Sequence, residues 1–445
     1  MENKTNKVRE NLEAWCSPPL EFPTKEIEQA YKQRARRMAD AILLKKPDRV
    51  PVVPMWEFFY ATYAGYSCED IMYDPQKAED SVVKTVSELQ PDGFQGPIFH
   101  MTGPVLDAYA SKDVLWPGHG LPTNQAHQFV EGEYMKADEY EIFLKDPSDF
   151  MLRYLLPRVS GNLGALAAVT PIRNCFAYFM QFGGWAGLGT PDGLKALEIL
   201  KDLSTASFEY IQWLVATTGK VVMMGYPPWC GSLAEAPFDI IGDTLRGTKG
   251  IMLDMFRQPD VLKEACEKLV PIMAEYTIAG ARAAGNHPIV FIPLHKGTAS
   301  TRDGKGGLMS LDQFEEFYWP TLRKLMLVLI ENGLVPNLLV EGDYTSRLEI
   351  ISDVPPGTCI YHFEHIDIHK AKKILGDKVC IRGCVPIHHM TLGTPDDVRA
   401  AAKEQIDVLG EGGGYMIDTT MASEQVKPEN MKALIEFTKE YGVYK

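Results

Sequence analysis

Three apolar runs decide the fold of this chain: LVPNLLVEGDY (334–344), TCIYHFEHIDIH (358–369) and KVCIRGCVPIHHM (378–390). Each run ends in a cluster of polar residues. Strands that are covered on both faces of a sheet show continuous rather than alternating apolar character. The three runs therefore predict consecutive, buried, parallel strands.

The polar ends of these runs place Glu341, Glu364 and Cys384 in a candidate metal pocket. Ligands bind at the carboxyl ends of the strands in parallel barrels. There are 22 residues between Glu341 and Glu364 and 19 between Glu364 and Cys384, so each gap fits one αβ unit. Three protein ligands would leave a fourth tetrahedral position open, as in catalytic zinc sites. Glu and His also solvate strand ends, and Cys is often an apolar filler, so a purely structural explanation stays open.

Further apolar runs raise the number of expected strands to eight, near residues 52, 92, 221, 288, 336, 359, 379 and 415. The run near 221 reads VVMMGYPPW (221–229). Helical patterns separate most of the runs, so we predict an α/β fold, a (β/α)₈ TIM barrel, formed by a single domain over residues 1–445. Residues 1–48 should form an N-terminal helical extension. Residues 107–149 lack βα periodicity, carry turn signals and are expected to form an inserted lid over the barrel mouth.

Aromatic residues follow two of the expected strands. Trp56, Phe58 and Tyr60 come after the first strand and Trp229 after the third, and aromatic walls suit a planar substrate. Packing in the core explains any single ring equally well. His295 ends the run at 288–297 and is a candidate proton donor or substrate contact, although a lone histidine at a strand end is often structural.

The composition limits the classes of partner. The formal net charge is −14, from 45 basic and 59 acidic residues, and no long block of one sign occurs. Nucleic acid and anionic membrane surfaces reward clustered Lys and Arg, so a small molecule or another protein is the expected partner. No apolar run approaches the roughly 18 residues that span a bilayer. Eight scattered cysteines and an N-terminus without a secretory pattern predict reduced thiols and a cytoplasmic protein.

Three longer stretches resemble the uroporphyrinogen decarboxylase superfamily: DRVPVVPMW (48–56), VMMGYPPWCGSLAE (222–235) and GDKVCIRGCVPIHHMTLGTPDDVRAAAKEQI (376–406). The resemblance covers most of the chain and implies the same barrel fold. The superfamily contains decarboxylases and also zinc-dependent methyltransferases that pass methyl groups to or from corrinoid proteins. The chemistry must therefore be chosen from the residues at the site.

Two branches of the superfamily fit this chain poorly. The decarboxylases bind substrate carboxylates with an arginine in an MRQAGRY-like segment, where this chain has MWEFFYATYAGY (55–66). The coenzyme M methyltransferases use a His-x-Cys pair and a later Cys, where this chain has Leu339, Glu341 and Asp418. Both the carboxylate-binding arginine and the thiol-activating ligand set are missing.

The set Glu341, Glu364 and Cys384 is more similar to the zinc-dependent methyltransferase component (methyltransferase I) of corrinoid-dependent O-demethylases. The resemblance implies a zinc cofactor, with His362 or His388 as possible substitute ligands. It also implies transfer of a methyl group from a methoxylated, aromatic small molecule to a Co(I) corrinoid, with a phenol as product. An ether oxygen is a poor leaving group, and a Lewis acid at that oxygen would assist its departure.

The corrinoid is expected on a separate protein. This chain has no D-x-H-x-x-G corrinoid-binding signature, since the nearest string, Asp367-Ile-His369-Lys-Ala-Lys372, lacks the glycine. Two other functions stay open. One is another reaction of the superfamily, either a corrinoid:thiol methyltransferase or a metal-free decarboxylase or lyase. The other is a binding barrel without catalysis.

Overall fold

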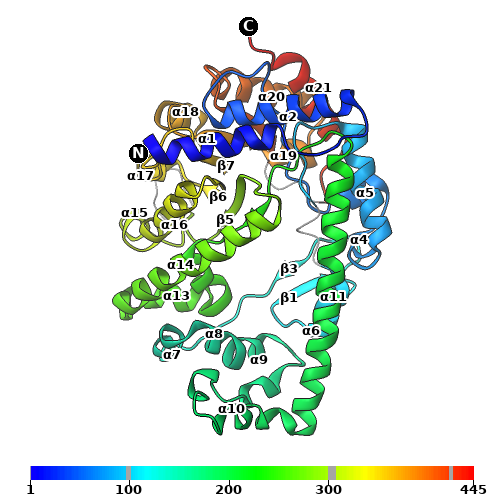
Figure 1. Ribbon diagram of the computed structural model, residues 1–445. Coiled ribbons are helices and arrows are strands. Elements are labelled where there is room, and N and C mark those ends of the chain that lie inside the picture. Colours follow the sequence, from blue (N-terminus) through cyan, green and yellow to red (C-terminus); the bar gives the residue numbers. More distant parts are fainter. Residues whose placement is uncertain (1, 97–101, 299–306, 420–423) are drawn as a thin grey trace.

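The fold is built on a parallel sheet in the order β4-β5-β6-β7-β8-β9, of which Figure 1 labels β5, β6 and β7. A computed structural model describes residues 2–96, 102–298, 307–419 and 424–445. The strands are β4 Ser232–Leu233, β5 Ile289–Leu294, β6 Val335–Asp343, β7 Ile360–His365, β8 Cys380–Val385 and β9 Tyr415–Thr419. Strands β6, β7 and β8 are the three apolar runs that the sequence predicts to be parallel neighbours, and that prediction is confirmed.

Two short extended segments close the sheet into a barrel. Val52 forms a parallel bridge with Ile417 of β9, and Phe94 forms one with Pro228, just before β4. The two segments are neighbours, because the Asp92 amide donates to the Val52 carbonyl at 2.9 Å. Eight extended segments thus follow one another around the ring, which confirms the predicted (β/α)₈ barrel.

The third barrel segment begins later than the sequence predicts. Helix α11, Pro191–Val222, includes the first two residues of the expected strand 221–229, and pairing starts only at Pro228. A helix of 32 residues ends in valines here, and a short β-branched run does not distinguish a helix end from a strand. The chain then turns at Gly225, where φ is +88° and a Cβ atom would lie 2.9 Å from the Ile27 carbonyl oxygen.

Helices cover the outside of the sheet, and local sequence signals fix where many of them begin. Proline stands in the first turn of α5, α11, α14, α20 and α21, where its missing N–H costs nothing. The longer helices around the barrel are α5 Pro75–Leu89, α13 Gly247–Arg257, α14 Pro259–Ala283, α16 Trp319–Glu331, α18 Ile368–Leu375, α20 Pro395–Leu409 and α21 Pro428–Tyr441. The shorter ones are α3 Phe59–Ala64, α4 Cys68–Tyr73, α12 Pro237–Asp239, α15 Leu311–Gln313, α17 Leu348–Ile351 and α19 Ile387–Thr391.

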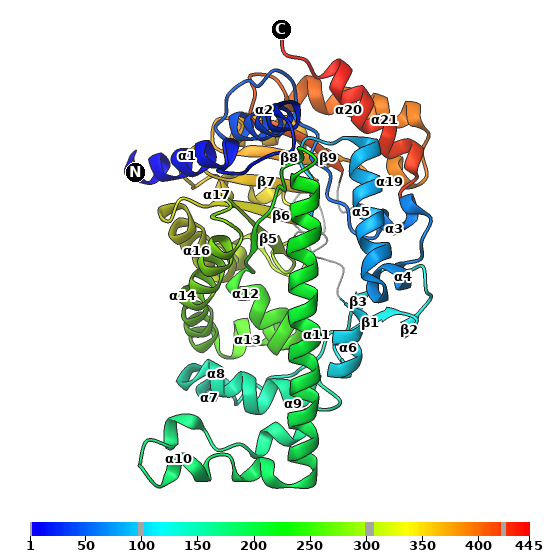
Figure 2. The same ribbon diagram turned by 45° about the vertical axis from the view of Figure 1, so that its right-hand side comes forward.

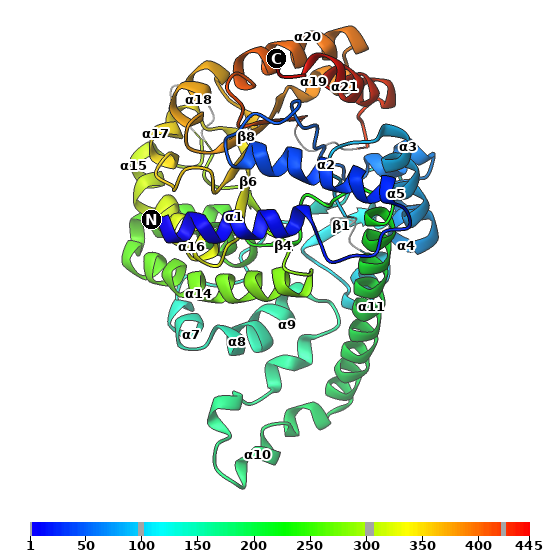
Figure 3. The same ribbon diagram turned by 45° about the horizontal axis from the view of Figure 1, so that its top comes forward.

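The N-terminal segment forms two helices that lie outside the barrel. Helix α1, Glu2–Cys16, packs against α2, Lys25–Ile42, and against α16 (Figure 3). The side chain of Thr24 caps α2 by accepting a hydrogen bond from the Ile27 amide. None of the helices in the described part of the chain is both long and apolar enough to cross a membrane.

The inserted region is longer than the predicted 107–149, because it continues to the start of α11. It contains a small sheet in the order β2-β1-β3 and a series of short helices, and it projects from the barrel (Figure 2). Its elements are α6 Gly103–Tyr109, β1 Val114–Pro117, β2 Gly120–Leu121, β3 Gln128–Phe129, α7 Tyr140–Lys145, α8 Pro147–Phe150, α9 Leu156–Val159 and α10 Met180–Gly183.

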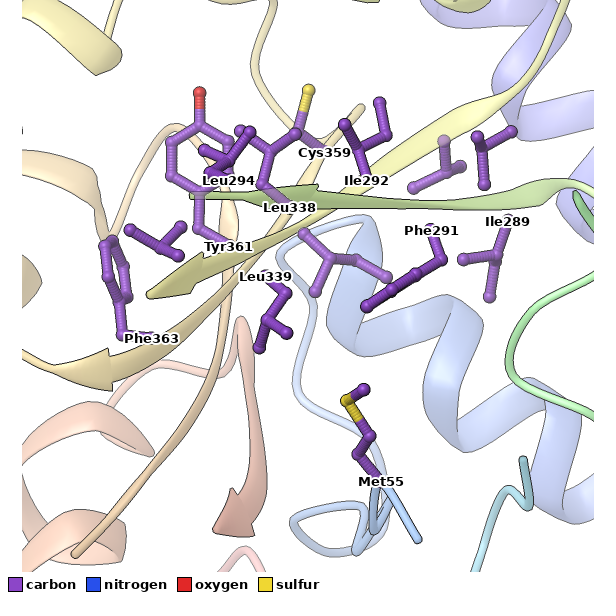
Figure 4. Packing of buried hydrophobic residues seen from close by; sticks show 14 of the residues in the cluster. Met55, Ile289, Phe291, Ile292, Leu294, Leu338, Leu339, Cys359, Tyr361 and Phe363 are labelled. Carbon is purple, nitrogen blue, oxygen red and sulfur yellow. The ribbon is translucent and has the colours of Figure 1, made fainter. Parts of the chain in front are cut away.

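The barrel core combines apolar packing with a buried polar layer. Side chains such as Phe291, Leu339 and Phe363 fill the space around the strands (Figure 4). Arg382 and Asp418 are also fully buried and form an ion pair at 2.8 Å. The Arg382 guanidinium donates a further hydrogen bond to the Val53 carbonyl at 2.8 Å, so this ion pair links β8, β9 and the first barrel segment.

Candidate metal centre at the strand ends

An acidic segment follows β4 and supplies Glu235, Asp239 and Asp243. The three carboxylates are spaced by four residues, and the last two lie on α12 and the π-helical turn η6, Ile240–Leu245. Residues four apart on a helix share one face. This spacing turns the carboxylates together toward the end of β5.

Asp239 fixes the end of β5. One carboxylate oxygen accepts hydrogen bonds from the His295 amide at 2.9 Å and the Tyr318 hydroxyl at 2.6 Å, and the other accepts from the Lys296 amide at 3.0 Å. Burial raises the pKa of Asp239 to about 6, although the neighbouring His295 charge opposes the rise. Asp239 therefore holds the backbone that presents His295.

His295 lies between two carboxylates. Its Nδ1 is 2.7 Å from Asp243 Oδ2, and its Nε2 is 3.6 Å from Glu341 Oε1. Burial alone would lower the pKa of His295, but the hydrogen bond to Asp243 and the charges of Asp239 and Glu341 outweigh burial and raise it to about 9. The imidazole is a cation at neutral pH while no metal is bound.

The inserted region reaches this cluster through Glu131. Lys296 Nζ lies 2.7 Å from Asp243 Oδ1 and 2.8 Å from Glu131 Oε1. Close by, the buried Arg246 donates to Glu133 at 2.6 Å and ties the same stretch of the insertion to the end of η6. These ion pairs place part of the inserted region beside the strand ends, and its role as a lid stays a prediction.

Glu235, Asp243 and His295 form a group suited to a metal ion. One ligand atom from each lies within 4.8 Å of the others, and no other such group occurs among the residues that the structure describes. Glu235 makes no hydrogen bond or ion pair within residues 2–96, 102–298, 307–419 and 424–445. Burial and the charges of Asp239 and Asp243 raise its pKa to about 8. The Glu235 carboxylate and the His295 imidazole are donors that zinc accepts, and Asp243 on Nδ1 matches the way metal-binding histidines are commonly oriented.

The sequence-predicted ligands Glu341, Glu364 and Cys384 are only partly brought together. Glu341 lies beside His295, and burial raises its pKa to about 7. Glu364 is exposed and accepts a hydrogen bond from the Gly342 amide at 2.7 Å. Cys384 is buried at the end of β8 with φ of +75°, a strained conformation that clusters at functional sites. The three do not form a group within 4.8 Å among the described residues, so this ligand set stays a prediction.

The two substitute ligands lie elsewhere. His362 is fully buried inside the barrel, where its Nε2 donates to the Thr419 carbonyl at 2.9 Å and lies 3.3 Å from Asp418. Burial and the nearby Arg382 charge hold the pKa of His362 well below its usual range, so it is neutral. His388 is exposed on α19. Neither belongs to the group around His295.

The four aromatic residues predicted to contact the substrate are core side chains in this structure. Trp56, Phe58 and Tyr60 are 0% exposed and Trp229 is 1% exposed. The Tyr60 hydroxyl donates to the Gln95 carbonyl at 2.7 Å. They do not line an open aromatic wall, because their packing against the core uses the ring faces, and contact with a substrate stays a prediction.

Sequence reasoning missed the carboxylates after β4. The signal was present as Glu235-x₃-Asp239-x₃-Asp243, a four-residue spacing directly after an apolar segment. It was overlooked because β4 has two residues and leaves no strand pattern to mark its end. His295 is the predicted site residue that the structure places at the centre of the group.

Comparisons with known proteins agree on the family and the fold. A family model described as uroporphyrinogen decarboxylase (URO-D) matches residues 188–441. A uroporphyrinogen decarboxylase from Chlorobium luteolum is 26% identical over 198 residues, which cover 42% of this chain and 51% of the relative. Another, from Methylococcus capsulatus, is 22% identical over 260 residues, which cover 57% of this chain and 68% of that relative. The chain spans about half the length of the first of these relatives.

A solved structure shares the fold along nearly the whole chain. It is a methyltransferase from Methanosarcina mazei, with a TM-score of 0.58 and 16% sequence identity, covering 92% of this chain and 98% of that one. At this identity the likeness reports on the fold alone.

Proposed function

Because this chain belongs to the uroporphyrinogen decarboxylase family of enzymes, we propose that it is a zinc-dependent methyltransferase that takes a methyl group from a methoxylated aromatic compound. The acceptor is the Co(I) corrinoid of a separate protein. The observation that carries the proposal is the group Glu235, Asp243 and His295 at the strand ends. In barrels of this class the chemistry takes place at that end.

Each residue of the group has a distinct part in this proposal. Glu235 is a ligand without a competing partner, and His295 offers Nε2 while Asp243 holds Nδ1. Zinc bound there would act as a Lewis acid at the ether oxygen of the methyl donor. Glu341, with a pKa of about 7, can hold a proton beside the same position and deliver it to the departing phenolate oxygen.

The set Glu341, Glu364 and Cys384 is the rival ligand set for the same ion. It shares Glu341 with the neighbourhood of His295, at 3.6 Å from Nε2. Two ligands of one tetrahedral zinc lie roughly 3.3 Å apart, from bond lengths of about 2.0–2.1 Å. The separation of His295 and Glu341 is close to that value, so in the rival set Glu341 would be a deprotonated ligand and not the proton donor.

A metal-free decarboxylase or lyase is the second candidate. The curated relatives carry the name uroporphyrinogen decarboxylase. Glu235 and Glu341, with pKa values of about 8 and about 7, would be wholly or partly protonated at neutral pH and could serve as acids without a metal. The missing arginine in residues 55–66 argues against the porphyrinogen substrate itself.

Metal content tests the proposal and separates the ligand sets. The purified protein should contain about one zinc per chain, and Glu235→Ala and His295→Ala should each lose it. Retention of zinc in both variants, with loss in Glu364→Ala and Cys384→Ala, would assign the rival set. Absence of zinc after reconstitution would refute the metal proposal and favour the lyase.

Turnover then tests the reaction. The zinc-loaded enzyme should release a phenol from methoxylated aromatics only when a reduced corrinoid protein is present. A thiol methyltransferase would instead form a methyl thioether, and a lyase would turn over without a second protein. A binding barrel would show no turnover with any of these mixtures.

A further inference from the structure

The part of the chain between residues 164 and 215, here called the arm, projects away from the barrel. It runs from a 3₁₀ turn at Gly164–Ala168 through α10 and along most of α11. All three ribbon views place α10 and the N-terminal end of α11 at the extremity of the molecule opposite the C-terminus (Figures 1, 2 and 3). The arm has its own small core, which includes Leu166, Leu188 and Ala196. It is therefore an ordered structure.

The arm nevertheless turns its largest apolar side chains outward. The exposed fractions are 86% for Phe176, 74% for Tyr178, 87% for Phe179, 79% for Phe182 and 54% for Trp185. With roughly 200 Å² for each aromatic side chain, these five expose about 750 Å². The largest apolar patch on a monomer is typically about 300–600 Å². A stable interface buries about 800 Å² on each partner, which this patch nearly supplies alone.

Helix α11 adds a second apolar stripe. Leu194, Leu197, Phe208, Ile211 and Val215 are each at least 43% exposed. At about 100° per residue, these five positions fall within a sector of about 100° on the helix. This face of α11 is therefore largely apolar and uncovered, and Lys201, whose side chain is 81% exposed, is the charged residue that falls within it.

The segment of the arm that carries the five aromatic side chains is almost free of charge. Between residues 159 and 191 the sequence contains a single charged residue, Arg173. Arg173 is already paired, at 2.8 Å from Asp146 and 3.2 Å from Asp149. A lipid surface with anionic headgroups would require clustered basic residues. The arm has only Arg173, Lys195 and Lys201, and they are interspersed with four acidic residues. The depletion of charge is instead typical of the core of a permanent protein interface.

We propose that the arm is the dimer interface between two copies of this chain. A corrinoid protein that must leave after each methyl transfer would use an interface no more apolar than ordinary surface. A patch of this size would aggregate if it were uncovered between encounters, so it requires a permanent occupant. A recess lined by Ile172, Phe176 and Trp185 lies beside the outward Phe179 and Phe182. A two-fold axis through the arm would insert the aromatic side chains of each copy into the recess of the other.

Sedimentation velocity on the full chain tests the proposal, which does not depend on the metal or the reaction. The wild type should sediment at roughly 100 kDa, twice 49.8 kDa, at micromolar concentration. Phe179→Arg and Phe182→Arg should each weaken the dimer at least about 30-fold, as expected for a hot-spot residue. Leu392→Arg, at a residue 82% exposed outside the arm, is the matched control and should stay dimeric.

None of the altered side chains belongs to a core, so the variants should stay folded and a lost dimer can be attributed to the arm. Circular dichroism spectra and melting curves of each variant should show a folded protein. A wild type that stays at 49.8 kDa across the concentration series would overturn the proposal, as would a dimer that resists both arginine substitutions or is lost equally in Leu392→Arg. A monomer that forms only a one-to-one complex with a corrinoid protein would assign the arm to that partner instead.

Discussion

Replacing Glu235 by Gln should stabilise the metal-free protein, and the gain should grow with pH. Glu235 is partly buried, has no hydrogen-bond partner among the described residues and faces Asp239 and Asp243, so its pKa rises from 4.5 to about 8. A carboxyl whose pKa is raised on folding binds its proton more tightly in the native state. Stability is therefore lost as pH rises from the unfolded value through the folded one.

The size of this loss of stability follows from the pH range between the unfolded and the folded pKa of Glu235. Between pH 5.5 and 7.5 the native Glu235 keeps most of its proton while the unfolded side chain has lost it, at a cost of about 1.4 kcal/mol per pH unit. The wild type should therefore lose about 3 kcal/mol that the Gln variant does not lose. At about 2.1 cal/mol/K of unfolding entropy per residue, this chain has about 0.9 kcal/mol/K, so the melting temperatures should diverge by about 3 °C.

Thermal melts with a chelator at both pH values provide the measurement. Zinc should then reverse the order, because it should stabilise the wild type and not Glu235→Gln. Glu364→Gln is the control, since that carboxylate is exposed and should show neither effect. The reasoning would be refuted if the difference in melting temperature between wild type and Glu235→Gln did not change with pH. It would also be refuted if zinc raised both melting temperatures equally.

Three further outcomes are expected. Arg382→Met should destabilise the protein by about 3–5 kcal/mol in urea titrations, because it leaves Asp418 buried without its partner, and adding Asp418→Leu should recover most of the loss. Tyr318→Phe should cost about 1–3 kcal/mol in the same assay by removing a donor to the buried Asp239, and an unchanged midpoint would argue against that hydrogen bond. Zinc binding should release protons from His295, whose pKa is about 9, so calorimetry in buffers of different ionisation enthalpy should show release at pH 7 and affinity rising toward pH 9.

The sequence predicts the barrel well where strands are long and buried on both faces. The runs that became β6, β7 and β8 carry a pattern that no exposed element shares, so both their existence and their order could be predicted. The start of the third barrel segment could not be predicted, because Val221 and Val222 belong to the end of a long helix. The packing of that helix, and not its local propensity, decides where it ends.

The sequence points to the candidate group only where a regular strand precedes a residue. His295 follows the six-residue strand β5 and is a predicted site residue, whereas Glu235 and Asp243 follow a strand of two residues and are not predicted. The aromatic residue Trp56 was assigned to a substrate wall because sequence alone does not tell which face of a ring is covered. The sequence also did not indicate that the apolar residues of the arm are exposed, because an apolar segment of this kind is usually buried in a core.

The barrel cannot close during synthesis until its last strand has left the ribosome, because the first barrel segment pairs with that strand. Val52 pairs with Ile417, which lies 365 positions later in the chain. At about 5–20 residues per second, a ribosome needs roughly 20–70 s to make that partner available. The first barrel segment thus leaves the ribosome as an unpaired apolar edge and must wait for nearly the whole polypeptide. We expect chaperones that bind extended apolar segments to hold this protein longest at its N-terminal quarter, and the last event of folding to join its two ends.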